Sequence, residues 1–295
     1  MFFNSKIPTL DGYENTLKNE SHKSPKKAFP IKKGYLTKKK KGGWIFIPIS
    51  ITGIDRILGT IPTGVSVLIL HTSECSWDAN ALLGITSVKT LERGGTVVFI
   101  ANDFPSETYP WRYAAETSRK AIEENRLFYI DLFSATGSDT ENKDPNVIIT
   151  SESTNLSYIL YHFHEVNNER LKRTNHSGKP VLWCYDNLST TFFLVGHEEE
   201  CLRFVWNVRR LIKKFGDIFL ATMNIGMHDS KVIATAKNIF DVVIELESLE
   251  NRGETVRYLR VTKNAGRPFR LERYQYTFDP FDRTFTIVNR YPREP

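Results

Sequence analysis

Eight residues between a predicted strand and a predicted helix lie where a phosphate-binding loop would be placed. The apolar run Val65–Leu70 predicts a buried β-strand, and the apolar spacing of Asp78–Glu92 predicts a helix. Between them, positions 71–78 read His-Thr-Ser-Glu-Cys-Ser-Trp-Asp. A loop that cradles phosphates has the pattern G-x-x-x-x-G-K-[ST], in which backbone N–H groups surround the anion. The spacing therefore indicates the scaffold of a nucleotide site.

The residues that this chemistry requires are replaced at all four specified positions. His71 and Ser76 stand in place of the two glycines. Trp77 replaces the lysine, and Asp78 replaces the Ser or Thr that holds Mg²⁺. Glu74 adds a carboxylate, and two unit charges about 5 Å apart at an effective dielectric of about 20 repel by about 3 kcal/mol. We therefore predict a degenerate nucleotide site, with no cofactor, at which neither ATP nor Mg²⁺ is expected to bind.

The altered loop is expected to have become structural. Trp77 is predicted to fill part of the space that a phosphate would occupy, so that replacing this buried ring by Ala would cost about 3 kcal/mol. Asp78 is expected near the positive N-terminal end of the helix. His71 is expected to pack near the edge of the sheet.

Apolar runs alternate with amphipathic helices along the rest of the chain. The further predicted strands of the core are Thr96–Ala101, Leu127–Leu132, Val181–Tyr185 and Ile218–Met223. The predicted helices are Pro110–Glu124, Asn155–Arg173, His197–Lys214 and Ser230–Asn238, and Ser134–Ser151 is predicted as a polar loop. Two hairpins are expected after residue 241. This pattern predicts an α/β fold, with a mostly parallel sheet, helices on both faces and C-terminal antiparallel hairpins.

The positive charge of the chain is concentrated near its start. The 295 residues carry a net charge of +6, with 40 basic and 34 acidic residues. Residues 1–43 contain eleven Lys and three acids, which leaves 29 basic and 31 acidic residues for 44–295. We predict a disordered Lys-rich tail over 1–43 and one folded domain over 44–295. Lys38, Lys39, Lys40 and Lys41 are candidate nucleic-acid contacts, and a merely solubilising tail is the alternative.

Other site classes find little support in the sequence. The three cysteines, Cys75, Cys184 and Cys201, form no CxxC pair and are predicted to be reduced, buried packing residues. No metal site is expected. No apolar run reaches the ~18 residues of a membrane-spanning helix, and no secretory signal is seen at the start. A cytoplasmic protein is therefore expected.

Three segments carry a resemblance to the KaiC-like group of RecA-superfamily ATPases. Thr52–Val65 (TGIDRILGTIPTGV) resembles the stretch before the phosphate loop in that family. Leu182–Ser189 (LWCYDNLS) is similar to its Walker B strand, and Phe99–Pro105 (FIANDFP) to its second core strand. The resemblance implies a RecA-like fold over about residues 48–288. It also implies that Asp103 and Asp186 are vestiges of catalytic carboxylates.

The sequence differs from active members of that family at residues that the resemblance links to ATP hydrolysis. The basic K-x-R pair that active relatives insert into a neighbouring subunit reads Lys263-Asn264-Ala265 here, without the Arg. Together with the altered loop, this predicts a non-catalytic member, or pseudo-ATPase, acting as a regulatory or assembly subunit. Its partner would be an active RecA/KaiC-like ATPase or a second copy of itself. A nucleic-acid-binding paralogue that uses the basic tail and a weak ATPase with a divergent loop are the two alternatives.

Overall fold

The computed structural model describes residues 46–47, 54–58, 61–106, 114–134, 146–150, 152–173, 181–251, 254–265, 269, 271–279 and 284–291. The predicted tail, with Lys38–Lys41, lies outside these described residues, so its properties stay predictions. No helix in the described ranges is long and apolar enough to cross a membrane.

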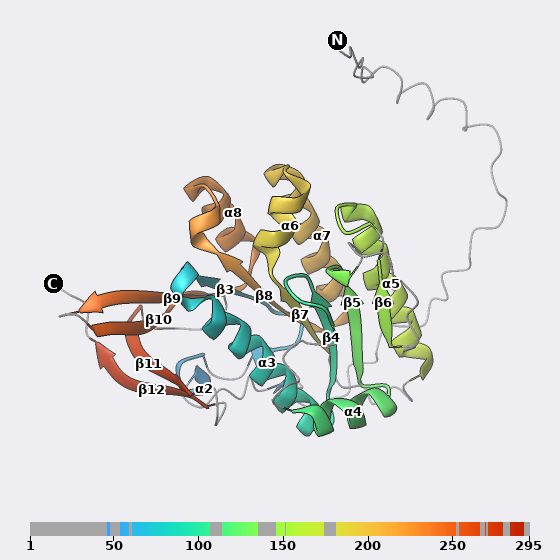
Figure 1. Ribbon diagram of the computed structural model, residues 1–295, viewed down its shortest axis with the longest axis horizontal. Coiled ribbons are helices and arrows are strands. Elements are labelled where there is room, and N and C mark those ends of the chain that lie inside the picture. Colours follow the sequence, from blue (N-terminus) through green and yellow to red (C-terminus); the bar gives the residue numbers. More distant parts are fainter. Residues whose placement is uncertain are drawn as a thin grey trace, which may run out of the picture. The chain divides into compact units, whose positions relative to one another are not determined.

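A ten-stranded sheet forms the centre of the folded domain (Figure 1). Its strands are β3 (Ser66–His71), β4 (Thr96–Ala101), β5 (Leu127–Asp131), β6 (Val147–Ile149), β7 (Val181–Asp186), β8 (Ile218–Asn224), β9 (Val242–Asn251), β10 (Glu254–Asn264), β11 (Arg273–Asp279) and β12 (Thr284–Tyr291). Their spatial order is β12-β11-β10-β9-β3-β8-β7-β4-β5-β6. The seven strands from β9 to β6 run parallel, whereas β10, β11 and β12 extend the sheet in antiparallel fashion. The predicted α/β architecture is therefore confirmed.

Helices cover both faces of this sheet. They are α2 (Ile54–Leu58), α3 (Ser76–Glu92), α4 (Ala115–Glu123), α5 (Leu156–Arg173), α6 (Leu188–Val195), α7 (Glu198–Phe215) and α8 (Ser230–Ile239). Short 3-10 turns lie at η1 (Ser73–Cys75) and η4 (Ile225–Met227), and a small separate pair joins β1 (Phe46–Ile47) to β2 (Ile61–Pro62).

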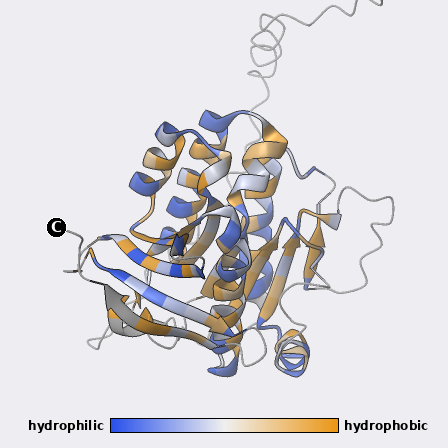
Figure 2. Cartoon of the chain, turned by 60° about the vertical axis from the view of Figure 1, so that its left-hand side comes forward, coloured by the Kyte–Doolittle hydropathy of each residue, from blue (hydrophilic) through white to orange (hydrophobic). Residues whose placement is uncertain are grey.

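Two hydrophobic cores lie on opposite faces of the sheet because side chains alternate along each strand. Val67 and Ile69 of β3 pack with α2, α3 and α4. Leu68 and Leu70 pack with α5, α6, α7 and α8 on the other face. Strands buried on both faces must be apolar throughout, and Figure 2 shows the central strands as mostly hydrophobic between helices of mixed character. All three cysteines are free and buried, as predicted.

The structure corrects the sequence reading at two places. Residues 134–151 were predicted as a loop, yet Val147–Ile149 forms β6, which pairs with β5 at the end of the sheet. No helix is predicted between Val181–Tyr185 and His197–Lys214, yet Leu188–Val195 forms the helix α6. Within α6, Phe192 packs into the core, whereas Phe193 is exposed.

The parallel strands give the domain two unlike edges. The carboxyl edge is defined here by the last residues of β3, β8, β7, β4 and β5, which are His71, Asn224, Asp186, Ala101 and Asp131. The amino edge is defined by the first residues of the same strands. In parallel α/β sheets, ligands bind outside the carboxyl ends of the strands. Of the residues predicted for the nucleotide site, His71 lies at the carboxyl edge, Glu74 lies in the turn η1 that follows, and Ser76, Trp77 and Asp78 begin α3.

Candidate functional site at the carboxyl edge

The loop after β3 forms a 3-10 turn that leads directly into α3, and it does not form an open phosphate-binding loop. The 3-10 turn η1 starts two residues after His71, and α3 starts at Ser76. Backbone N–H groups of this loop are used within the protein. That of Thr72 donates to the carbonyl of Leu246 (3.2 Å), and that of Cys75 donates to the carbonyl of Thr72 (3.1 Å). The N–H of Ser76 donates to the carbonyl of Ser73. Three of the N–H donors that a phosphate loop would turn toward an anion are therefore already used within the protein.

Asp78, at the position where a phosphate loop holds Mg²⁺, is tied to the C-terminal strands. Its side chain is 1% exposed. The hydroxyl of Tyr276 on β11 donates to Asp78 Oδ2 at 2.7 Å, and Arg257 Nε on β10 lies 3.4 Å from the same oxygen. Burial raises the pKa of Asp78, whereas Tyr276 and Arg257 lower it. The carboxylate thus links the first turn of α3 to the late strands. Its position in that turn is as predicted.

Tyr276 anchors this link from the other side. Its ring stacks on Phe285 of β12, with ring centroids 4.3 Å apart, and is itself buried. The Tyr276 hydroxyl also lies 3.7 Å from the Sγ atom of Cys75. Sequence reasoning missed both Tyr276 and Arg257. No local signal could have found Tyr276, because 198 positions separate it from Asp78.

Trp77 corrects the predicted structural role of the loop. The prediction placed its ring in the vacated phosphate space, but its side chain is 53% exposed. Successive residues of a helix point about 100° apart, so that the burial of Asp78 and Ala79 turns Trp77 outward. The predicted loss of about 3 kcal/mol on its removal does not apply to an exposed ring. Trp77 instead belongs to the surface of the carboxyl edge.

The remaining loop residues divide between core and surface. His71 is fully buried, and its Nδ1 lies 2.9 Å from the carbonyl of Thr72. Burial lowers the pKa of His71, which favours a neutral imidazole, and its packing at the sheet edge is as predicted. Ser76 is partly buried, and Glu74 is exposed. A hydrogen bond from its own backbone N–H lowers the pKa of Glu74, so it is negatively charged at neutral pH.

Asp103 and Asp186 lie at the same edge, on the ends of neighbouring strands. Asp103 accepts hydrogen bonds from the hydroxyl of Thr190 and from the amide of Asn187 (3.3 Å), so it is held against the start of α6. Asp186 is fully buried, with Thr222 Oγ1 3.5 Å from its Oδ1. The peptide bond between Asp186 and Asn187 is cis. Asp103 is thus held by hydrogen bonds from its own chain, and Asp186 is enclosed at the end of β7.

Asn102 lies beside Asp103 and Asp186 at the carboxyl edge and contacts the start of α6. Its backbone N–H donates to the carbonyl of Asp186 at 2.9 Å. Its side-chain amide donates to the carbonyl of Asn187 (3.2 Å) and to Thr191 Oγ1 (3.0 Å). Asn102 therefore fixes the turn after β7 instead of facing a ligand.

Lys263, which the resemblance aligned with a basic residue acting on a neighbouring subunit, is bound within its own chain. Its Nζ donates to the carbonyls of Lys237 (2.9 Å) and Asn238 (3.0 Å), at the end of α8. This contact lies at the amino edge. Across the described ranges, no group of three or more His, Cys, Asp or Glu side chains is arranged to hold a metal ion.

Comparison with known proteins gives a structural relative. No family model matches the chain, and no curated protein matches it in sequence. Its structure is similar to the crystal structure of the KaiC-like protein PH0186 from the hyperthermophilic archaeon Pyrococcus horikoshii, with a TM-score of 0.63 and 15% sequence identity. The match covers 84% of this chain and 100% of that one. The chain therefore has a RecA-like α/β fold, that of a KaiC-like protein.

Proposed function

We propose that this protein is a non-catalytic RecA/KaiC-like protein, a pseudo-ATPase that serves as a regulatory or assembly subunit in the cytoplasm. The observation that carries the proposal is the set of contacts that the Asp78 carboxylate makes within the protein. Its Oδ2 accepts a hydrogen bond from the Tyr276 hydroxyl and lies 3.4 Å from Nε of the partly exposed Arg257. A magnesium ion bound there would have to displace these contacts, and no hydroxyl of Ser or Thr stands at that position to hold it.

Two further features support the loss of nucleotide binding. The loop N–H groups of Thr72, Cys75 and Ser76 already donate to backbone carbonyls. The charged Glu74 at the loop surface repels a triphosphate, and Trp77 supplies no cation in place of the missing lysine. A site whose N–H groups at Thr72, Cys75 and Ser76 are already used, and which has neither the lysine nor the Ser or Thr hydroxyl of a phosphate loop, gives little differential binding to a phosphoryl-transfer transition state.

The fold suggests what such a protein does. In the RecA/KaiC-like proteins that the sequence resembles, this fold meets neighbouring subunits, and the proposal is that this chain keeps such surfaces without a working nucleotide site. A protein partner, either an active RecA/KaiC-like ATPase or a second copy, is therefore the proposed ligand. A role of Lys38–Lys41 in nucleic-acid binding remains a separate prediction for the tail.

A phosphate-release assay tests the proposal. Full-length protein with Mg·ATP is expected to release phosphate at the rate of a buffer blank. The variant Asp186→Asn, which alters the remaining Walker B carboxylate, should give the same rate. Release above the blank that Asp186→Asn abolishes would instead establish a weak ATPase and overturn the proposal.

A further inference from the structure

A line of basic and aromatic side chains runs along the outward face of α7. The opposite face of this helix is apolar and packs into the core through Cys201, Phe204, Val205, Val208, Leu211 and Ile212. On the outward face Arg203, Trp206, Arg210 and Lys213 are exposed. We call these four residues the α7 stripe. Because they follow one another at intervals of three and four residues, they lie on one side of the helix, over about 15 Å.

Acids are few around the α7 stripe. Those of α7 lie together in its first turn, and those of the flanking helices α5 and α8 (Figure 1) are two partly buried residues of α5; they are Glu198, Glu199, Glu200, Glu165 and Glu169. Glu199 Oε2 lies 3.9 Å from Arg203 Nη2, but both side chains are exposed, and such a pair contributes only about 0–1 kcal/mol. From Trp206 to Phe215 the helix contains no acid, and Lys214 adds a further exposed base. The stripe is therefore a positively charged surface.

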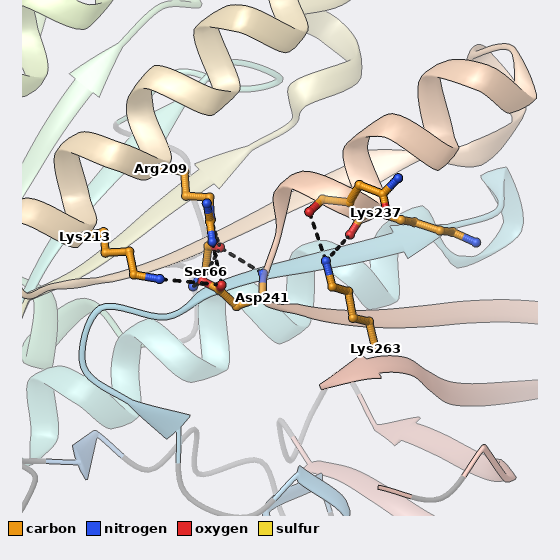
Figure 3. Close-up of polar contacts among 7 residues, drawn as sticks. Ser66, Arg209, Lys213, Lys237, Asp241 and Lys263 are labelled. Atoms are coloured by element: carbon orange, nitrogen blue, oxygen red, sulfur yellow. Dashed lines mark hydrogen bonds and ion pairs between the residues drawn. The ribbon is translucent and has the colours of Figure 1, made fainter. Parts of the chain in front are cut away.

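Trp206 is held in place at the surface by the residues beneath it. Its ring is 44% exposed, and the guanidinium carbon of Arg209 lies 5.4 Å from the ring centroid. Arg209 is itself fixed, because its Nη2 donates to Asp241 Oδ1 at 2.6 Å and its Nε donates to Ser66 Oγ at 3.2 Å (Figure 3). Asp241 in turn accepts hydrogen bonds from the backbone N–H and the hydroxyl of Ser66, at 3.0 and 2.9 Å. A ring that is already held loses little side-chain entropy when a partner covers it.

The residue types and their spacing are typical of a protein contact surface. Trp and Arg are enriched among the residues that contribute most to binding between proteins. Side chains at intervals of three and four residues form the ridges through which one helix packs on another. The α7 stripe therefore offers a ridge, with a fixed Trp between basic residues, along which a second helix can lie.

We infer that the α7 stripe binds an acidic helix of a partner protein. Asp or Glu side chains of that helix pair with Arg203, Arg210 and Lys213, so that the two surfaces are complementary in charge. An apolar side chain between these acids covers Trp206 and excludes water from the neighbouring ion pairs. The inference rests on the proposed assembly role and deepens it, because it names the chemistry of the partner.

Two other negatively charged ligands fit this surface less well. A single-stranded nucleic acid binds in a basic groove that follows its backbone, whereas the stripe is a ridge on the outside of a helix. A helix that lies on a membrane inserts its apolar face into the lipid, and the apolar face of α7 is buried in the protein core. An acidic helix needs neither a groove nor an inserted apolar face.

Peptide selection against the full-length protein, without nucleotide, tests this inference. A phage-displayed library of random peptides of about 16 residues offers about 24 Å of helix, which is enough to span the stripe. Enriched peptides are expected to carry Asp or Glu at intervals of three and four residues and to bind with a micromolar Kd in fluorescence polarisation. Arg203→Glu/Arg210→Glu should weaken their binding at least tenfold, and Trp206→Ala at least fivefold. Because the basic tail is the same in every variant, its attraction for acids does not contribute to these differences.

Arg119→Glu/Lys120→Glu is the matched control. It changes the net charge by the same amount at exposed positions of α4, which covers the other face of the sheet. At about 0.15 M salt, charges more than about 8 Å away are largely screened, so peptide binding should stay within about twofold of that of the unchanged protein. If circular dichroism shows that the charge reversal unfolds α7, Arg203→Gln/Arg210→Gln takes its place, with the same weakening expected.

Three results would overturn the inference. They are the absence of any enriched peptide, enriched peptides without acids, and peptides that bind Arg203→Glu/Arg210→Glu as tightly as the unchanged protein. Tighter binding of a labelled thymidine oligonucleotide or of phosphatidylserine vesicles through the same two Arg would also overturn it, because the stripe would then serve nucleic acid or lipid. Phosphate release is measured separately, so a failure of this test leaves the missing ATPase activity standing.

Discussion

Replacing Asp78 by Ala should lower the free energy of unfolding by about 3 kcal/mol. The substitution leaves the buried Tyr276 hydroxyl without the acceptor that lies 2.7 Å away, and it removes the carboxylate facing Arg257. A buried polar group that loses its partner carries the full cost of desolvation. Urea unfolding followed by circular dichroism measures the change.

Trp77→Ala is the matched control, one residue earlier in the same helical turn. Because the Trp77 ring is 53% exposed, its removal should lower the free energy of unfolding by less than about 1 kcal/mol. The double variant Asp78→Ala/Tyr276→Phe should lose less stability than the two single variants together, since both single changes remove the same hydrogen bond. Equal losses for Asp78→Ala and Trp77→Ala would refute the assigned role of Asp78.

Asp217→Ala should lower the free energy of unfolding by a larger amount, about 4 kcal/mol. Asp217, just before β8, accepts hydrogen bonds from the backbone N–H of Val181 and from Trp183 Nε1, both at 3.0 Å, and Arg170 lies 3.7 Å away. Trp183 is fully buried, so its N–H would have no water to replace the lost acceptor. Thermal unfolding should show a fall in Tm of roughly 10 °C.

Asp229→Ala serves as the control for Asp217→Ala. Asp229 precedes α8, is exposed, and makes no side-chain hydrogen bond that caps that helix. Its replacement should shift Tm by about 2 °C or less. A similar small shift for Asp217→Ala would show that the hydrogen bonds to Val181 and Trp183 contribute little to stability.

The architecture could be predicted because strands buried on both faces must be continuously apolar. Val65–Leu70, Thr96–Ala101 and Val181–Tyr185 each show such a run, and each is a central strand in the structure. The edge strand Val147–Ile149 was missed because it is short and lies in a polar stretch. The helix Leu188–Val195 was missed because it has no charged residue and no long periodic pattern.

The site was harder to predict than the fold. The sequence indicates which residues stand at the positions expected for a phosphate loop, but not which way each of them points. Trp77 and Asp78 are neighbours, and the winding of α3 decides that the ring is outside and the carboxylate inside. The partner of Asp78 comes from β11, on a hairpin far along the chain, and only the tertiary structure brings the two together.

Calorimetric titration of Mg·ATP into the full-length protein measures directly whether the carboxyl edge has lost nucleotide binding. No saturable heat is expected at nucleotide concentrations up to about 1 mM, which means a binding free energy weaker than about −4 kcal/mol. The single reversion Trp77→Lys should leave this result unchanged, because Glu74, Ser76 and the Asp78–Tyr276 hydrogen bond remain. A dissociation constant at or below the micromolar range for the unchanged protein would contradict the account.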